Sequence, residues 1–140
     1  MPRKTIFLPT LAAVLLIGTT QSFACVGGPF DQAAYDRSPL IFEGSVIRTN
    51  DKDINDVTGE VLSRTYLFSI DKVWKGPAMM RNANIRNTGG GFVKGTSYLI
   101  VADNAGDGYS AEDCGHSAPL SASGAARDFL THQATLSIEE

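Results

Sequence analysis

Residues that commonly build catalytic sites are scarce in this sequence. Its 140 residues include only two histidines and two cysteines, and they contain no recognisable nucleophile motif. Acid–base and nucleophilic catalysis depend on such groups held close together, so we expect that the protein is not an enzyme and needs no cofactor. Long apolar stretches are absent too. A membrane span needs about 20 apolar residues, and the apolar run Leu11–Ile17 is far shorter.

The composition is otherwise that of a folded protein. Hydrophobic residues make up 43% of the chain and charged residues 19%. These fractions are close to those of globular proteins, which excludes a wholly disordered chain. The length suits a single domain.

The first residues have the pattern of a secretory signal peptide, which we place at residues 1–24. A basic start is followed by the apolar run Leu11–Ile17. Ser22 and Ala24 then place small residues at the two positions that a signal peptidase reads before Cys25. The sequence therefore predicts an exported protein, either secreted or periplasmic.

The mature chain, residues 25–140, is acidic. Removal of the signal peptide takes away two basic residues and no acidic ones, which leaves a net charge of −5. A nucleic-acid binder usually carries a basic surface, so we expect no nucleic-acid partner. The short apolar run described above also leads us to expect no membrane span. We expect one domain, with a disordered tail after about residue 132.

The only two cysteines, Cys25 and Cys114, both lie in the mature chain. In an oxidising compartment, two thiols without a third most simply form one disulfide. A second reading makes Cys25 the lipidated first residue of a lipoprotein. The disulfide is the better prediction, because lipidation would leave Cys114 unpaired and Ser22 stands where a lipoprotein signal usually has leucine.

Alternation of apolar and polar residues predicts a mostly β structure. The polar segment 50–60 is expected to be a turn, and residues 103–108 a hairpin turn. The alternation slips near Lys72, which predicts a β-bulge. The expected strands cover residues 39–49, 62–76, 82–86, 97–102 and 109–113.

Two helices are expected beside these strands. Asp31 can cap a short helix over residues 32–37. A second helix, capped by Ser121, is predicted from apolar residues at helical spacing: Ala122, Ala125, Ala126, Phe129 and Leu130. Five short strands in a small chain avoid exposed edges best when they close into a Greek-key barrel.

Three segments and a cysteine carry a resemblance to a known family. They occur in the order Phe42-x-Gly44-x-Val46, Phe68-x-Ile70-x-x-Val73-Trp74-Lys75-Gly76, Phe92-x-x-Gly95-x-x-Tyr98-Leu99-Ile100-Val101-Ala102 and Cys114. Over roughly residues 25–131 the chain resembles the bacterial branch of the tissue inhibitor of metalloproteinases family. The resemblance implies a five-stranded OB-fold-type Greek-key barrel with a short N-terminal helix and a C-terminal helix.

The same resemblance implies a mechanism and a partner. In that family, the α-amino nitrogen and carbonyl oxygen of the first cysteine chelate the catalytic zinc of a protease. Carried over, Cys25 would bind the zinc and Val26 would enter the specificity pocket, with Gly27 completing the contact. A catalytic zinc keeps an open position for water, which an amine can occupy. The expected partner is a zinc metalloprotease, and the chain would hold no metal of its own.

The sequence also departs from the family pattern. The inhibitors usually begin Cys-x-Cys, and here Gly27 takes the third position. The cysteine that normally receives the first one is replaced within residues 87–91. An alternative therefore stays open, in which Cys25 only ties the terminus to a noncatalytic OB-fold module that binds another exported protein.

Two further candidate metal sites carry weaker signals. Asp51-x-Asp53-x-Asn55 is similar to the start of a calcium loop, but Asp56 replaces the turn glycine and Leu62 replaces the bidentate glutamate. We interpret this segment as a solvated hairpin loop.

Cys114-Gly115-His116 together with His132 matches no zinc spacing. A small enzyme or metal carrier that uses His116 is the third and least favoured reading.

Overall fold

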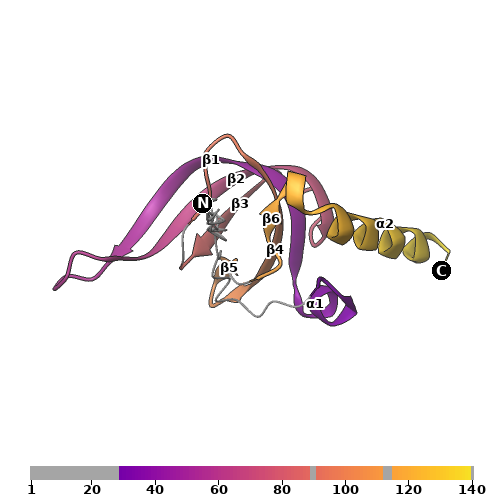
Figure 1. The fold of residues 1–140 in the computed structure, drawn as a ribbon, viewed down its shortest axis with the longest axis horizontal. Coiled ribbons are helices and arrows are strands. Elements are labelled where there is room, and N and C mark those ends of the chain that lie inside the picture. Colours follow the sequence, from indigo (N-terminus) through magenta and orange to yellow (C-terminus); the bar gives the residue numbers. More distant parts are fainter. Residues whose placement is uncertain (1–28, 89–90, 112–114, 140) are drawn as a thin grey trace, which may run out of the picture.

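A computed structural model describes residues 29–88, 91–111 and 115–139. The protein is mainly β, with two α-helices and one 3₁₀ turn among these residues (Figure 1). In chain order the elements are α1 (Gln32–Arg37), β1 (Leu40–Ile54), β2 (Val61–Lys75), β3 (Asn82–Asn87), β4 (Ser97–Ala105), β5 (Gly108–Ser110), β6 (Ala118–Pro119), the 3₁₀ turn η1 (Leu120–Ala122) and α2 (Gly124–Ile138).

The strands are joined in a ring of hydrogen-bonded pairs. The order is β1-β2-β3-β5-β4, and β4 pairs back to β1. Every pair in this ring is antiparallel except β3 with β5. The short strand β6 adds to the edge of β4. Each of the five strands expected from the sequence overlaps one of the strands of this ring, although several bounds differ, and residues 112 and 113 of the last expected strand lie outside the described residues.

One set of alternate residues fills the inside of the ring. Successive side chains of a strand point to opposite faces, and the members that β1 and β4 contribute to this inner cluster are all even-numbered, within residues 40–46 and 98–102. Its buried members are Leu40, Phe42, Val46, Tyr66, Phe68, Ala83, Ile85, Tyr98, Ile100, Ala102 and Ala111. We call this set the inner core.

The odd-numbered residues of the same strands build a second cluster outside the ring. Ile41, Leu99 and Val101 are buried there together with Leu130 of α2. Half-buried side chains pack around them: Phe30, Tyr35, Trp74, Leu120 and Ala126. This outer core attaches both helices to the ring.

An ion pair crosses the edge of the outer core. Glu43 of β1 is buried, and its carboxylate accepts a hydrogen bond from the guanidinium of Arg127 on α2. A buried carboxylate is costly without a cationic partner. The pair therefore favours the observed position of α2 over positions shifted along β1, in which Glu43 would lose its partner.

The irregularity predicted near Lys72 is present. The β1–β2 register skips Asp71 on one side of Lys72 and Trp74 on the other. Gly44 lies opposite this distorted stretch, and a Cβ built on it would be 2.3 Å from the carbonyl oxygen of Ser69. Only glycine permits the two backbones to approach so closely.

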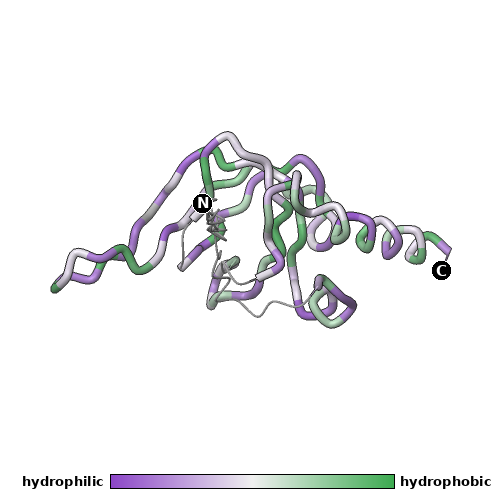
Figure 2. Tube along the Cα trace, viewed as in Figure 1, coloured by the Kyte–Doolittle hydropathy of each residue, from purple (hydrophilic) through white to green (hydrophobic). Residues whose placement is uncertain are grey.

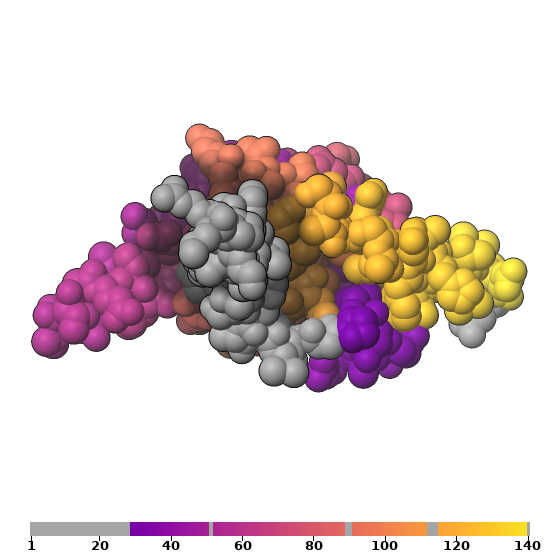
Figure 3. All heavy atoms as spheres, in the orientation of Figure 1, coloured from indigo at the N-terminus to yellow at the C-terminus, as the bar shows by residue number. Residues whose placement is uncertain are grey.

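The prediction of a turn over residues 50–60 was wrong in its first half. Strand β1 continues to Ile54, and the reversal spans Asn55 and the residues up to Gly59. Residues 53–63, which are the end of β1, the turn and the start of β2, lie beyond the β2–β3 pairing and form a two-stranded arm that projects from the ring (Figures 1 and 3). Neither face of this arm covers a core, so its sequence lacks the alternation that marks a half-buried strand, as the mixed hydropathy in Figure 2 shows.

The hairpin turn is also shorter than residues 103–108. Strand β4 continues to Ala105, which pairs with Gly108. The two-residue turn needs a positive φ, and Gly106 supplies it with φ of 66°.

The helices differ from expectation mainly at their ends. Asp31 caps α1 as predicted, because its carboxylate accepts the backbone N–H of Ala34 at 2.9 Å. The predicted cap Ser121 instead lies in η1, and α2 starts after Ser123. Helix α2 also continues to Ile138, through the segment assigned to a tail. No helix in the described part of the chain is long and apolar enough to cross a membrane.

Two leucines on α2 test whether this helix is docked as described. Leu130 is 1% exposed and Leu136 is 46% exposed. We expect Leu130→Ala to lower the free energy of unfolding by about 2–4 kcal/mol, because it leaves a cavity in the outer core. Leu136→Ala should change it by less than about 0.5 kcal/mol. Equal effects in chemical denaturation would contradict the docking.

Two glycines test the close approach of β1 and β2. Gly44→Ala should cost about 1–3 kcal/mol, because the new methyl group meets the backbone of Ser69. Gly124 begins α2 and has open space around it, so Gly124→Ala should leave stability unchanged or raise it by up to about 1 kcal/mol. Thermal melts of both variants measure the difference, and a neutral Gly44→Ala would show that the strands separate without cost.

Candidate functional site

The residues predicted to make the inhibitory contact, Cys25, Val26 and Gly27, lie outside the described residues, and so does Cys114. The predicted disulfide therefore has no described geometry. What the structure describes is the chain that follows each cysteine: Pro29 and Phe30 after the first, Gly115 and His116 after the second.

These two following segments are in contact. The rings of Phe30 and His116 pack edge to face with centroids 5.5 Å apart. Phe30 also packs on Phe129 of α2 at 5.3 Å, and Tyr35 of α1 approaches the same ring at 6.2 Å. Aromatic pairs of this geometry each contribute about 0.5–1.5 kcal/mol beyond their buried area. The segment at Phe30 is thus anchored on α2 and beside His116.

The Val73-Trp74-Lys75-Gly76 motif holds α1 in place. Lys75 Nζ donates hydrogen bonds to the carbonyl oxygens of Tyr35 at 2.5 Å and Asp36 at 3.3 Å. A cation at a helix C-terminus neutralises the carbonyls that lack an intrahelical partner. Trp74 packs in the outer core, and Gly76 ends the strand at φ of 115°. Trp74, Lys75 and Gly76 therefore have structural roles in the fold.

The Phe92-to-Tyr98 segment closes one end of the inner core. The ring of Phe92 packs against Tyr66, Phe68 and Tyr98 at centroid distances of 5.3, 5.2 and 5.0 Å. The Tyr98 hydroxyl accepts the backbone N–H of Val93 at 2.8 Å, which fixes the intervening turn. These contacts leave the motif without an exposed reactive group.

The segment similar to a calcium loop serves the hairpin instead. The Asn55 side-chain oxygen accepts the backbone N–H groups of Val57 and Thr58, a common way to stabilise a turn. Asp53 accepts a hydrogen bond from Ser63 on β2 at 2.8 Å. Within the described residues, no group of three or more histidine, cysteine or carboxylate side chains is placed to hold a metal ion.

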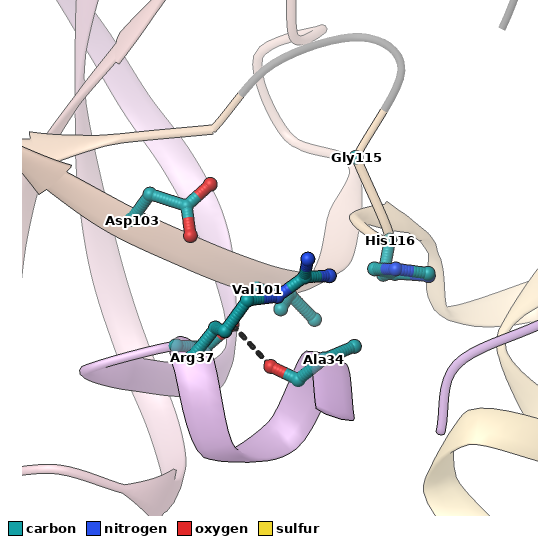
Figure 4. Close-up of a pocket in the computed structure, with 7 residues that line it drawn as sticks. Ala34, Arg37, Val101, Asp103, Gly115 and His116 are labelled. Atoms are coloured by element: carbon teal, nitrogen blue, oxygen red, sulfur yellow. Dashed lines mark hydrogen bonds between the residues drawn. The ribbon is translucent and has the colours of Figure 1, made fainter. Parts of the chain in front are cut away.

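A polar pocket of about 310 Å³ lies between α1, β4 and the segment that follows Cys114. Arg37 comes from the last turn of α1, Asp103 from β4 and His116 from that segment (Figure 4). The guanidinium of Arg37 extends into the space between the other two side chains. The remaining lining residues are Ala34, Ser38, Val101 and Gly115.

The charged groups of this pocket, Arg37 and Asp103, are exposed to solvent and have no protein partners in the described structure. Neither Arg37 nor Asp103 makes a side-chain hydrogen bond or an ion pair with a described residue, and the Glu43–Arg127 pair is the one salt bridge found there. Two other polar groups of the lining already have hydrogen-bond partners. The Ser38 hydroxyl donates to the Ala34 carbonyl oxygen, and the Val101 backbone N–H donates to the Ser117 hydroxyl. The open polar groups are therefore the three ionisable side chains.

Sequence reasoning missed two of these three residues. His116 was considered as a metal ligand with His132 and as the residue that a small enzyme or metal carrier would use. His132 lies on α2 and does not line the pocket. Arg37 and Asp103 stand in segments 66 positions apart and form no motif. The packing of α1 against β4 brings them together. No local pattern in the sequence indicates that packing.

Comparisons of this chain with protein-family profiles and with curated proteins return no match.

The role of Lys75 can be tested without disturbing the core. Lys75→Met keeps the alkyl stem but removes the cation from the end of α1, so we expect the free energy of unfolding to fall by about 1 kcal/mol. Lys72→Met is the matched control, since the exposed Lys72 ammonium lies 3.6 Å from the centroid of the Trp74 ring and does not cap a helix among the described residues. Urea denaturation distinguishes them, and equal losses would argue against capping by Lys75.

Proposed function

We propose that this protein is an exported OB-fold protein that inhibits a zinc metalloprotease, chelating the protease zinc with the α-amino nitrogen and carbonyl oxygen of Cys25. In this proposal residues 1–24 are removed as a signal peptide and the mature chain begins at Cys25. Val26 enters the specificity pocket of the protease and Gly27 completes the contact. The protein is not itself an enzyme.

The ring of strands supports the fold part of the proposal. An OB-fold is a five-stranded Greek-key barrel. Pairing of β1 with both β2 and β4 returns the sheet to its first strand, and the parallel β3–β5 pair requires one crossing connection. The glycines of the family-like segments also stand where the backbone demands them, at the β1–β2 approach and at positive φ.

The contact between Phe30 and His116 is the observation that carries the inhibitory mechanism. Cys25 precedes Phe30 by five positions, and Cys114 precedes His116 by two. Extended chain covers at most about 18 Å and about 7 Å over those lengths. Since the rings touch at 5.5 Å, a Cys25–Cys114 disulfide is within reach of both segments. Such a bridge would limit the freedom of the chelating terminus before binding, which lowers the entropic cost of association.

The projecting arm favours the second candidate function, a noncatalytic module that binds another exported protein. Beyond Ser45, strand β1 pairs only with β2 among the described strands. The tip carries exposed apolar side chains, with Ile54 50%, Leu62 49% and Val57 93% exposed. Exposed apolar groups on an unpaired strand edge are typical of a protein-binding surface.

Extending the mature N-terminus by one residue distinguishes between the two proposed functions. An additional alanine before Cys25 converts its amine to an amide, which is a poor zinc ligand, and adds bulk at the metal. Inhibition of a zinc protease by the mature protein should then disappear, while the melting temperature stays within a few degrees because the core is unchanged. Val26→Gly should weaken inhibition more modestly, through loss of an apolar contact worth about 1–3 kcal/mol.

The control variant changes the arm. Val57→Ser should leave inhibition unaltered, because Val57 lies at the tip of the arm. An extended protein that still inhibits would contradict chelation through Cys25. Loss of inhibition in Val57→Ser alone would favour the arm as the binding element. Intact mass of the exported protein checks the premise, since free thiols or a lipid on Cys25 would exclude the bridged, unlipidated terminus.

A further inference from the structure

We propose that the pocket between α1 and β4 binds a small zwitterion, with a free dipeptide as the ligand that fits best. In this site Arg37 binds the ligand carboxylate and Asp103 binds the ligand ammonium group. The proposal is independent of the inhibitory function, because it uses neither Cys25 nor the arm.

The arrangement of charges selects the class of ligand. Arg37 presents a planar fork of N–H donors, which matches a carboxylate and always carries its charge. Asp103 offers only acceptors when ionised. The two groups line one pocket without forming an ion pair with each other, so each can engage a ligand group of opposite sign. A simple anion would meet the Asp103 carboxylate, and a simple cation would meet Arg37.

The third polar group and the apolar wall fit the same ligand. The His116 imidazole lies on the far side of Arg37 from Asp103 (Figure 4). A neutral imidazole both donates and accepts hydrogen bonds, so it can serve the second carboxylate oxygen or a peptide amide. Val101 and Ala34 supply a small apolar wall. Short side chains such as those of alanine suit such a wall.

The pocket is partly open to solvent, and its volume suits a small ligand. At about 30 Å³ for each water in the liquid, a pocket of about 310 Å³ holds the equivalent of about ten waters. A ligand of roughly ten non-hydrogen atoms therefore fills it, which corresponds to a dipeptide of small residues. The volume is at the lower end of small-molecule sites.

Three ligands and two variants test this assignment by calorimetric titration. The probes are L-alanyl-L-alanine, its N-acetyl derivative, which lacks the ammonium group, and its C-terminal amide, which lacks the carboxylate. We expect the free dipeptide to bind the unmodified protein at least about tenfold more tightly than either derivative, because each loses a charge-assisted hydrogen bond.

The variants should remove these preferences one at a time. In Asp103→Asn the free and N-acetylated dipeptides should bind equally, and in Arg37→Gln the free dipeptide and its amide should bind equally. Arg81→Gln and Asp107→Asn are matched controls, because Arg81 and Asp107 are exposed like Arg37 and Asp103 but lie outside this pocket. Both controls should retain the full selectivity.

Several outcomes would overturn the proposal. These are the absence of binding to the free dipeptide at millimolar concentration, equal binding of all three probes to the unmodified protein, or selectivity that survives both pocket variants. Circular dichroism of each variant shows whether lost binding reflects unfolding. If Arg37→Gln is unfolded, the comparison of the three probes on the unmodified protein still decides the question.

Discussion

The structure depends on one constraint, the double pairing of the first half of β1. Residues 41–45 pair with β2 on one side and with β4 on the other, so this segment closes the ring. It is also buried on both faces: Phe42 points into the inner core, and Ile41 points into the outer core. A one-residue slip of register would exchange these two sets of side chains. Gly44 opposes such a slip, because a side chain at this position would meet the carbonyl oxygen of Ser69.

Through the outer core, β1 holds together segments that lie far apart in the sequence. Leu130 packs on Ile41 and its neighbours, and the Glu43–Arg127 pair fixes the position of α2 along β1. Helix α2 in turn presents Phe129 to Phe30, and Phe30 lies beside His116. The chain that follows each cysteine is therefore positioned by packing alone, whatever bond joins the cysteines. A disulfide between them would reinforce an existing arrangement.

Sequence reasoning succeeded where burial imposes a period and failed where it does not. The alternation around Phe42 and the compact apolar run around Ile100 predicted strands, because both segments are packed against a core. The outer half of β1 has no core to cover, so residues 50–54 read as a polar turn although they are paired with β2. The cap of α2 was misplaced because Ser121 and Ser123 are equally good candidates by type, and only the 3₁₀ turn at Leu120–Ala122 decides between them.

The pocket shows why the candidate site could be predicted only in part. The sequence indicated His116 by its residue type alone. Its contact with Phe30 and its place beside Arg37 arise from tertiary packing. His116 belongs both to the segment anchored near the terminus and to the pocket wall. A ligand that orders His116 would thus also restrict Phe30, and a terminus held by a protease would restrict His116. Because linkage is reciprocal, any coupling between the two proposed binding events must be equal in both directions. Both the Phe30–His116 contact and the proposed Cys25–Cys114 bridge would connect the two sites.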